Sequence, residues 1–397
     1  MTTMADNKDK KVLNVPHLRF PEFSGEWEKC KLGDIATGFD YGMNAAAKPF
    51  DGENKYIRIT DIDEASSTYI DKDIVSPDGT LTENYLVNDR DILLARTGAS
   101  TGKSYLYRKS DGKLYYAGFL IRANVTKHNP YFVFSQLHTH RYWSWVSIMS
   151  ARSGQPGINS QEYSSFPVYV TSLREEEKIS ALLSLIDERI ATQNKIIEDL
   201  KLLKSAITDR LYSELRGTAY TYRQLFDVIN ERNKDNIYHN VLSASQELGM
   251  IDRSDINIDI KFEQASIVSY KIVRKGDYVV HLRSFQGGFA FSEKTGICSP
   301  AYTILRPKDN LMYGYLSHYF TSKQFVKSLN LVTYGIRDGR SINVDEWLNM
   351  KVVIPEKQKQ LHILTTINSI EFKLRNEQKI YTRLIKQKSY LLRQMFI

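Results

Sequence analysis

Two stretches of the chain carry apolar residues at spacings that alternate between four and three positions, which predicts helices that pack along one another. The apolar positions of the first stretch are Ile179, Leu183, Ile186, Ile190, Ile197 and Leu200. Those of the second stretch are Ile363, Ile367, Ile370, Leu374, Leu384 and Leu391. Because surface helices rarely keep so narrow an apolar stripe over about five heptads, we expect two long helices that form a coiled coil.

The two stretches belong to an internal repeat. Residues 158–213 are repeated without a gap by residues 342–397, and the offset from Ile158 to Ile342 is 184 positions. Lys195-Ile196 and Lys379-Ile380 recur within the repeat at that offset. Solenoids need three or more short repeats, so two long copies favour a duplicated architecture. If a pseudo-twofold axis relates the two copies, the helices run antiparallel.

Each helical stretch follows a region of short β-type runs that are separated by turn residues. The runs of the first half are 56–59, 91–96 and 119–123, followed by a helical region at 130–148. In the second half, residues 276–283 parallel 89–96 and residues 299–305 parallel 117–121, followed by a helical region at 312–329. Each half should therefore fold as a mixed α+β module.

A chain of 397 residues exceeds the size at which one core usually stops growing, so two domains and connecting helices are expected. We predict five segments along the chain. They are a mobile N-terminal arm at 1–15, a first module at 16–173, a central helix at 174–216, a second module at 217–355 and a distal helix at 356–397.

The charge and the cysteines add modest constraints. A net charge of +8 is compatible with a polyanionic partner, and the distal helix carries nine Lys and Arg against three Glu. That surplus could face DNA or an acidic partner, or it could be a solvated face. Two cysteines, Cys30 and Cys298, indicate free thiols in a reducing compartment. With no signal peptide and no membrane-length apolar run, we expect a cytoplasmic protein.

Polar loops after the β-type runs are the candidate DNA contacts, because flexible loops on rigid modules often hold binding residues. Arg can bind guanine, and Gln can bind adenine, through two hydrogen bonds each. The candidates are Arg96, Thr97, Ser100, Lys103, Arg152 and Gln155 in the first half, and Arg283, Ser284, Gln286, Arg337 and Arg340 in the second. The alternative is that these loops are ordinary solvated turns.

No catalytic or metal-binding residues stand out. The run 98–104 is one residue too short for a phosphate-binding loop. The run Asn129-Pro130-Tyr131-Phe132 departs from the Asn-Pro-Pro-aromatic tetrad of amino-methyltransferases, and a helix-initiating Asn-Pro explains it better. His138 and His140 should lie on different faces of a helix, which disfavours a metal site. We therefore expect no cofactor in this chain.

The chain resembles the specificity subunits of type I restriction-modification systems. The residues that carry the resemblance are Pro16 to Phe23 with Trp27, Asp91 to Ala99, Ser153 to Asn159 and Glu175 to Ile179. The match is weaker at Pro355 to Gln358. This resemblance implies two α/β target-recognition domains, separated by antiparallel helices, that read the two halves of a split DNA sequence.

The resemblance also implies partners. Two modification subunits, which bind S-adenosylmethionine and methylate adenine, are expected to dock on this chain. Restriction subunits that use ATP and Mg²⁺ for translocation and cleavage are expected to join them. Two other hypotheses stay open: a self-sufficient DNA methyltransferase or nuclease with an unrecognised active site, and a scaffold whose helices only pair other proteins.

Overall fold

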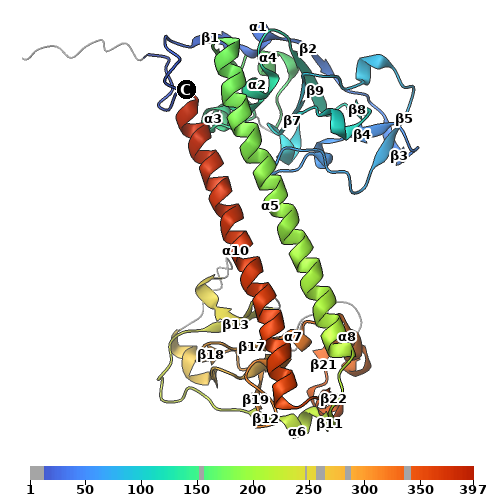
Figure 1. Cartoon of the computed structure of the whole chain (residues 1–397), viewed down its shortest axis with the longest axis vertical. Helices are drawn as coiled ribbons and strands as arrows, with labels where there is room; N and C mark the ends of the chain where they lie inside the picture. Colours follow the sequence, from blue (N-terminus) through green and yellow to red (C-terminus); the bar gives the residue numbers. More distant parts are fainter. Residues whose placement is uncertain (1–12, 152–155, 246–247, 256–263, 282–287, 335–340) are drawn as a thin grey trace, which may run out of the picture. The chain divides into compact units, whose positions relative to one another are not determined.

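A computed structural model describes residues 13–151, 156–245, 248–255, 264–281, 288–334 and 341–397. The chain divides into two compact units (Figure 1). Unit 1 comprises residues 1–194 and 379–397, and unit 2 comprises residues 195–378. Each unit therefore holds one module and about half of each long helix, α5 (Leu173–Ser213) and α10 (Lys357–Met395). The predicted mobile arm lies largely outside the described residues, and the five segment boundaries stay predictions.

Unit 1 is built on an antiparallel sheet of four strands, in the order β2-β9-β6-β7. The strands of this sheet are β2 (Ala36–Tyr41), β9 (Leu120–Val125), β6 (Asp91–Ala95) and β7 (Ser104–Leu106). The other strands of unit 1 are β1 (Glu28–Lys31), β3 (Ala46–Pro49), β4 (Lys55–Ile57), β5 (Val75–Asp78), β8 (Leu114–Tyr116) and β10 (Pro167–Val170). Its short helices are α1 (Leu32–Ile35), α2 (Pro130–Gln136), α3 (His140–Met149) and α4 (Ser160–Ser164).

Unit 2 repeats this plan with a sheet in the order β12-β19-β16-β17. The strands of this sheet are β12 (Phe226–Ile229), β19 (Thr303–Pro307), β16 (Tyr278–Val280) and β17 (Phe289–Phe291). The other strands are β11 (Thr218–Thr221), β13 (Leu242–Ser245), β14 (Gly249–Asp252), β15 (Lys271–Val273), β18 (Gly296–Cys298), β20 (Thr333–Tyr334), β21 (Ser341–Ile342) and β22 (Lys351–Ile354). The short helices are α6 (Tyr222–Leu225), α7 (Tyr315–Tyr319), α8 (Lys323–Ser328) and α9 (Val344–Asn349).

A buried aspartate lies at the start of equivalent strands in the two modules. Asp91 begins β6, and Asp277 immediately precedes β16. Asn124 donates a hydrogen bond to Asp91 at 2.7 Å, and Arg306 donates one to Asp277 at 3.0 Å. Asp91 is thus the structural counterpart of Asp277. The comparison of the two sequences placed Arg90 opposite Asp277, which is wrong by one residue. The error arose because residues 89–91 are all polar, so no apolar residue marks where the strand begins.

Helix α2 connects the sheet of unit 1 to the long helices. Its N-cap is Asn129, whose side chain accepts hydrogen bonds from two backbone N–H groups, and Pro130 occupies the first helical position. The prediction of a helix-initiating Asn-Pro is confirmed. Val133 packs on the core of the sheet, whereas Phe132 packs on α5 and α10. The predicted helix at 130–148 is interrupted at Thr139, because that side chain caps α3.

In unit 1 the first half of α5 packs antiparallel against the last half of α10 (Figure 1). Ile179 lies in a buried cluster with Met395, and Ile186, later on α5, lies in a cluster with Leu384, which is earlier on α10. An ion pair of 2.6 Å joins Lys388 to Asp187 beside this contact. In unit 2, Lys204 and Glu371 form an ion pair of 2.6 Å, and the helix segments again run antiparallel.

The predicted apolar stripes are buried or partly buried at all twelve positions. However, the stripes do not contact only the opposite helix. Ile179 and Leu183 pack with Trp27 of the first module, and Ile363 and Ile367 lie within the core of the second module. The outer turns of each helix therefore pack against a module as well as against the other helix.

The C-terminal end of each long helix is anchored by an aromatic pair. The ring of Phe396, just after α10, lies 5.2 Å from Phe132 in unit 1. The ring of Tyr212, near the end of α5, lies 5.8 Å from Tyr315 in unit 2, and its hydroxyl donates to the Tyr315 carbonyl at 2.7 Å. Tyr212 and Phe396 are separated by the repeat offset, so the duplication preserves this anchor.

Within the described part of the chain, every helix is too short or too polar to cross a membrane.

Candidate nucleic-acid interface

The first candidate loop joins the antiparallel strands β6 and β7. The Ala95 N–H donates to the Lys103 carbonyl at 2.8 Å, and the Gly102 N–H donates to the Ala95 carbonyl at 3.0 Å. Gly102 has φ +93°, and a Cβ there would lie 2.8 Å from Val146. The loop is therefore a rigid turn between two strands. A phosphate-binding loop leads from a strand into a helix, so this geometry agrees with the rejection of a nucleotide site.

Arg96 is fixed at the base of this turn by an aromatic ring. Its guanidinium carbon lies 4.7 Å from the centre of the Tyr41 ring, and one N–H group donates to the Gly118 carbonyl at 3.5 Å. Such a cation–π contact contributes about 0.5 to 1 kcal/mol at an exposed site. Tyr41 is held in turn, since its hydroxyl accepts a hydrogen bond of 3.3 Å from the Ser160 N–H. The guanidinium is thus ordered before any ligand binds.

The other predicted residues of this loop differ in their contacts. Lys103 lies 3.5 Å from Glu64, whose side chain is 86% exposed, so this ion pair is weak and easily replaced. Thr97 forms a β-bridge with Gly157. Ser100, like the other three, is half-buried. All four side chains lie within or beside one turn.

The structure brings the second candidate loop of the first module beside the first one. The Gly98 N–H donates to the Pro156 carbonyl at 3.0 Å, and the Ile158 N–H donates to the Arg96 carbonyl at 2.9 Å. Arg152 and Gln155 themselves lie outside the described residues. The segment that follows them, residues 156–158, is fixed against the turn.

Three exposed aromatic side chains near the turn were missed from the sequence. Tyr41 is 42% exposed, Phe119 is 58% exposed and Trp143 is 42% exposed. The Phe119 carbonyl accepts the Arg96 N–H at 3.0 Å, and the Trp143 ring lies beside Gly102. The sequence gives no sign that Phe119 and Trp143 are exposed, because each stands next to a buried apolar or aromatic residue in the chain.

In the second module the corresponding residues are described only at the ends of the loops. Arg283, Ser284, Gln286, Arg337 and Arg340 lie outside the described residues. The His281 N–H donates to the Gly288 carbonyl at 2.6 Å across the base of one loop, and strands β20 and β21 pair across the base of the other. The His281 ring packs edge-on against Tyr302 at 5.1 Å. An aromatic residue therefore supports the first loop of this module too.

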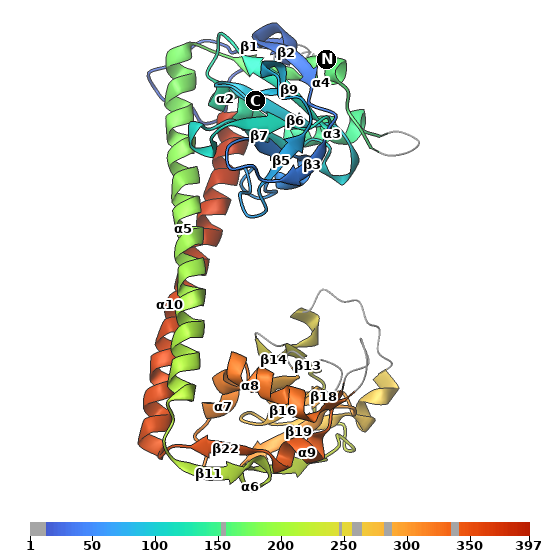
Figure 2. The same ribbon diagram turned by 90° about the vertical axis from the view of Figure 1, so that its right-hand side faces the viewer.

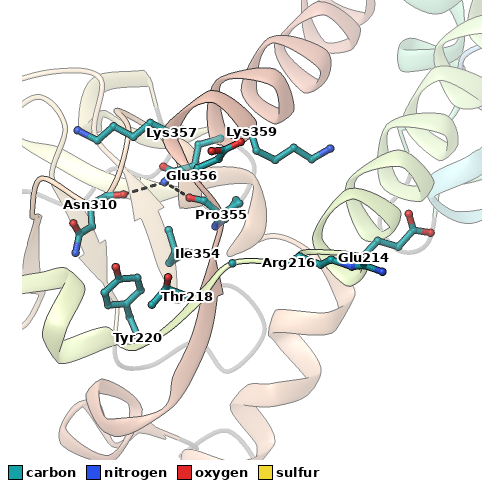
Figure 3. Close-up of a pocket in the computed structure, with 12 residues that line it drawn as sticks. Glu214, Arg216, Thr218, Tyr220, Asn310, Ile354, Pro355, Glu356, Lys357 and Lys359 are labelled. Atoms are coloured by element: carbon teal, nitrogen blue, oxygen red, sulfur yellow. Dashed lines mark hydrogen bonds between the residues drawn. The ribbon is translucent and has the colours of Figure 1, made fainter.

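A groove of about 730 Å³ lies elsewhere in unit 2, at the beginning of α10 (Figure 3). Gln360 is one of the residues that line it, and it donates to the carbonyls of Asn310 and Pro355, both at 2.9 Å. The same side chain accepts the Met312 N–H at 2.9 Å. Gln360 therefore uses its polar atoms to tie α10 to the module.

Among the residues that the structure describes, no three His, Cys, Asp or Glu side chains are grouped to hold a metal ion. His138 and His140 were expected on different faces of one helix, but His138 lies in the break between α2 and α3 and His140 begins α3. The two rings bond separate serines. His138 contacts Ser67 at 2.9 Å, and His140 contacts Ser144 at 3.3 Å.

The chain is similar to proteins of one family. Residues 24–202 match the model of the type I restriction modification DNA specificity domain. The specificity subunit of the type I restriction enzyme MjaVIII from Methanocaldococcus jannaschii is 24% identical over 208 residues, which are 52% of this chain and 46% of that protein. The matched stretch therefore spans less than half of that relative.

Solved structures share the fold over nearly the whole chain. The type I restriction-modification S subunit from M. genitalium has a TM-score of 0.59 at 14% identity, and the match covers 96% of this chain and 99% of that one. A structure from a study of the assembly and conformational transition of the type I R-M system has a TM-score of 0.55 at 15% identity, over 93% and 97% of the two chains. The matches thus show a type I DNA specificity domain at residues 24–202 and the fold of the S subunits over nearly the whole chain.

The sequence features by which this chain resembles the type I specificity subunits have structural roles. Arg19 and Trp27 both donate hydrogen bonds to Glu175, in the first turn of α5. Asn159 and Glu162 cap α4 reciprocally, and Asn343 caps α9 at the equivalent place of the repeat. The family pattern thus marks the framework, whereas the predicted DNA contacts lie on the loops that the framework holds.

Proposed function

We propose that this chain is the non-catalytic DNA-specificity subunit of a type I restriction-modification complex, in which each module reads one half of a bipartite DNA target. The observation that carries the proposal is the packing of residues 156–158 against the turn that holds Arg96 in the first module. Rigid support by Tyr41 and by the 156–158 segment favours base reading, because contacts to base edges require fixed donors.

The candidate residues divide into two kinds of contact. Arg96 presents a planar fork that suits guanine, and Gln155 suits adenine, so we assign these two to base reading. Lys103, Thr97 and Ser100 suit phosphate contacts, which position the module without selecting a sequence. Arg152 is a further proposed DNA contact of the first module. The corresponding proposed contacts of the second module are Arg283, Ser284, Gln286, Arg337 and Arg340.

The helices α5 and α10 act as a spacer of fixed length between the half-sites. Rigid linkage makes the second half-site contact intramolecular, which raises the overall affinity without new contacts. Two modification subunits dock on this chain and supply S-adenosylmethionine chemistry. Restriction subunits supply the ATP- and Mg²⁺-dependent steps, and the whole complex acts in the cytoplasm.

The test is a map of methylated adenines in the host genome with and without this gene. We expect one split motif to lose methylation on deletion. Exchange of residues 28–150 for those of another specificity subunit should then change one half of the motif only. If deletion leaves every methylated motif in place, the proposed function is wrong. If the purified chain alone methylates or cuts DNA, the self-sufficient enzyme is the correct hypothesis.

A further inference from the structure

One face of α10 in unit 1 carries a row of positive charge. The exposed side chains Lys379, Arg383, Lys386 and Arg393 follow one another at spacings of four, three and seven residues, which place them on one side of a helix. Tyr390, 51% exposed, lies on the same side between the last two. The row extends about 21 Å along the helix, at about 1.5 Å per residue. We call these five residues the basic face.

The basic face points away from α5. Leu384 is buried against α5, and Lys388 pairs with Asp187 of that helix, while both residues lie about half a turn from the centre of the basic face. Residues 379–397 contain no Asp or Glu. Among the described residues, the four cations of the basic face form no ion pair. Their charge is therefore available to a ligand in solvent.

The packing of the helices does not require this charge. The repeat supplies an internal comparison, since the residues of α5 that lie 184 positions earlier are Lys195, Asp199, Leu202 and Asp209. The equivalent face of α5 thus has one cation and two carboxylates. Both helices bury the same type of apolar stripe, so that burial does not depend on the charge of the opposite face. On α5 one of the two carboxylates, Asp209, accepts the Lys323 N–H of the second module at 3.2 Å.

We propose that the basic face binds DNA phosphates beyond the bases that the first module reads. This inference rests on the proposed function, which places a duplex beside unit 1. Lys and Arg bind phosphates independently of sequence, and Tyr390 can donate to a phosphate or pack on a sugar. A helical protein partner would instead need apolar anchors every three or four residues, and the basic face holds charges at those positions.

The experiment compares two triple variants of the full chain, assembled with its modification subunits. The test variant is Lys379→Gln, Arg383→Gln and Lys386→Gln. The control removes three exposed cations elsewhere, as Lys195→Gln, Lys201→Gln and Lys323→Gln. Binding is titrated between about 50 and 300 mM salt, with a duplex that carries the methylated motif and with a scrambled duplex. Thermal melting checks that both variants fold.

We expect the test variant to bind both duplexes roughly ten- to a hundredfold more weakly at about 0.15 M salt, and its slope of log affinity against log salt to fall by about 2 to 3. The ratio of the two affinities should stay unchanged. A test variant that behaves like the control overturns the proposal. So does intact DNA binding with loss of modification-subunit binding, which would make the face a protein interface.

The two proposals fail separately. If the unaltered complex binds both duplexes equally, the proposed specificity function is wrong. The proposal for the basic face is tested only by comparing the test and control variants in their slopes of log affinity against log salt.

Discussion

Arg19 binds the carboxylate of Glu175 through two hydrogen bonds, of 2.7 and 2.8 Å. Glu175 is 1% exposed, and the Thr171 hydroxyl also donates to it at 2.7 Å. Burial raises the pKa of the Glu175 carboxyl, but the hydrogen bonds from Arg19 and Thr171 outweigh burial and hold the pKa below its usual value. This carboxylate therefore stays charged and fixes the segment around Arg19 to the first turn of α5.

The replacement Arg19→Met should destabilise unit 1 by about 3 kcal/mol, because it leaves Glu175 buried without its charge partner. The loss is measured by urea denaturation. The control is Lys178→Met, which removes the exposed ion pair with Glu22 and should cost less than about 1 kcal/mol. Equal losses in the two variants would contradict the structural role of the Arg19–Glu175 pair.

The ring of Phe396 should contribute more to stability than the hydroxyl group of Tyr212. The change Phe396→Ala removes a buried ring from a cluster with Trp27 and Phe132, and should cost about 3 kcal/mol. The change Tyr212→Phe keeps the ring and removes only the hydrogen bond to Tyr315, which should cost about 1 kcal/mol. Denaturation curves of both variants test this order, and a larger effect of Tyr212→Phe would refute it.

Acid should weaken unit 1 through His138. Burial and the nearby Lys388 lower the pKa of His138 to about 4, from an ordinary value near 6.5. The folded state therefore excludes a proton that the unfolded chain accepts, so stability is full above pH 6.5 and falls as the pH drops toward 4. We expect a loss of about 1 to 3 kcal/mol over that range. The variant His138→Gln should show a shallower pH dependence, and an unchanged profile would exclude His138 as the cause.

Arg96 should contribute to sequence discrimination more than to general affinity. The change Arg96→Lys keeps the charge but removes the planar fork, and should lower the preference for the target duplex by roughly tenfold. The change Lys103→Gln should weaken binding to target and scrambled duplexes to a similar extent. Competition binding with the two duplexes distinguishes these results. If Arg96→Lys leaves the preference intact, Arg96 does not read a base.

The sequence by itself determined the repeat, the two long helices and the helix start at Asn129-Pro130. These features depend on residues a few positions apart, and a periodic stripe or a capping side chain has the same meaning wherever the helix lies. Their positions could therefore be predicted before the modules were known. The likeness between the two modules followed from their matching β-type runs.

Only the tertiary structure decided which side of each element is used. It placed Phe132 on the long helices and Val133 on the sheet, and it left Phe119 exposed beside Arg96. It also showed that Asp91, and not Arg90, is the counterpart of Asp277. Whether an apolar or charged side chain is buried depends on residues far away in the chain, because burial is a property of packed neighbours. Local sequence patterns do not contain that information.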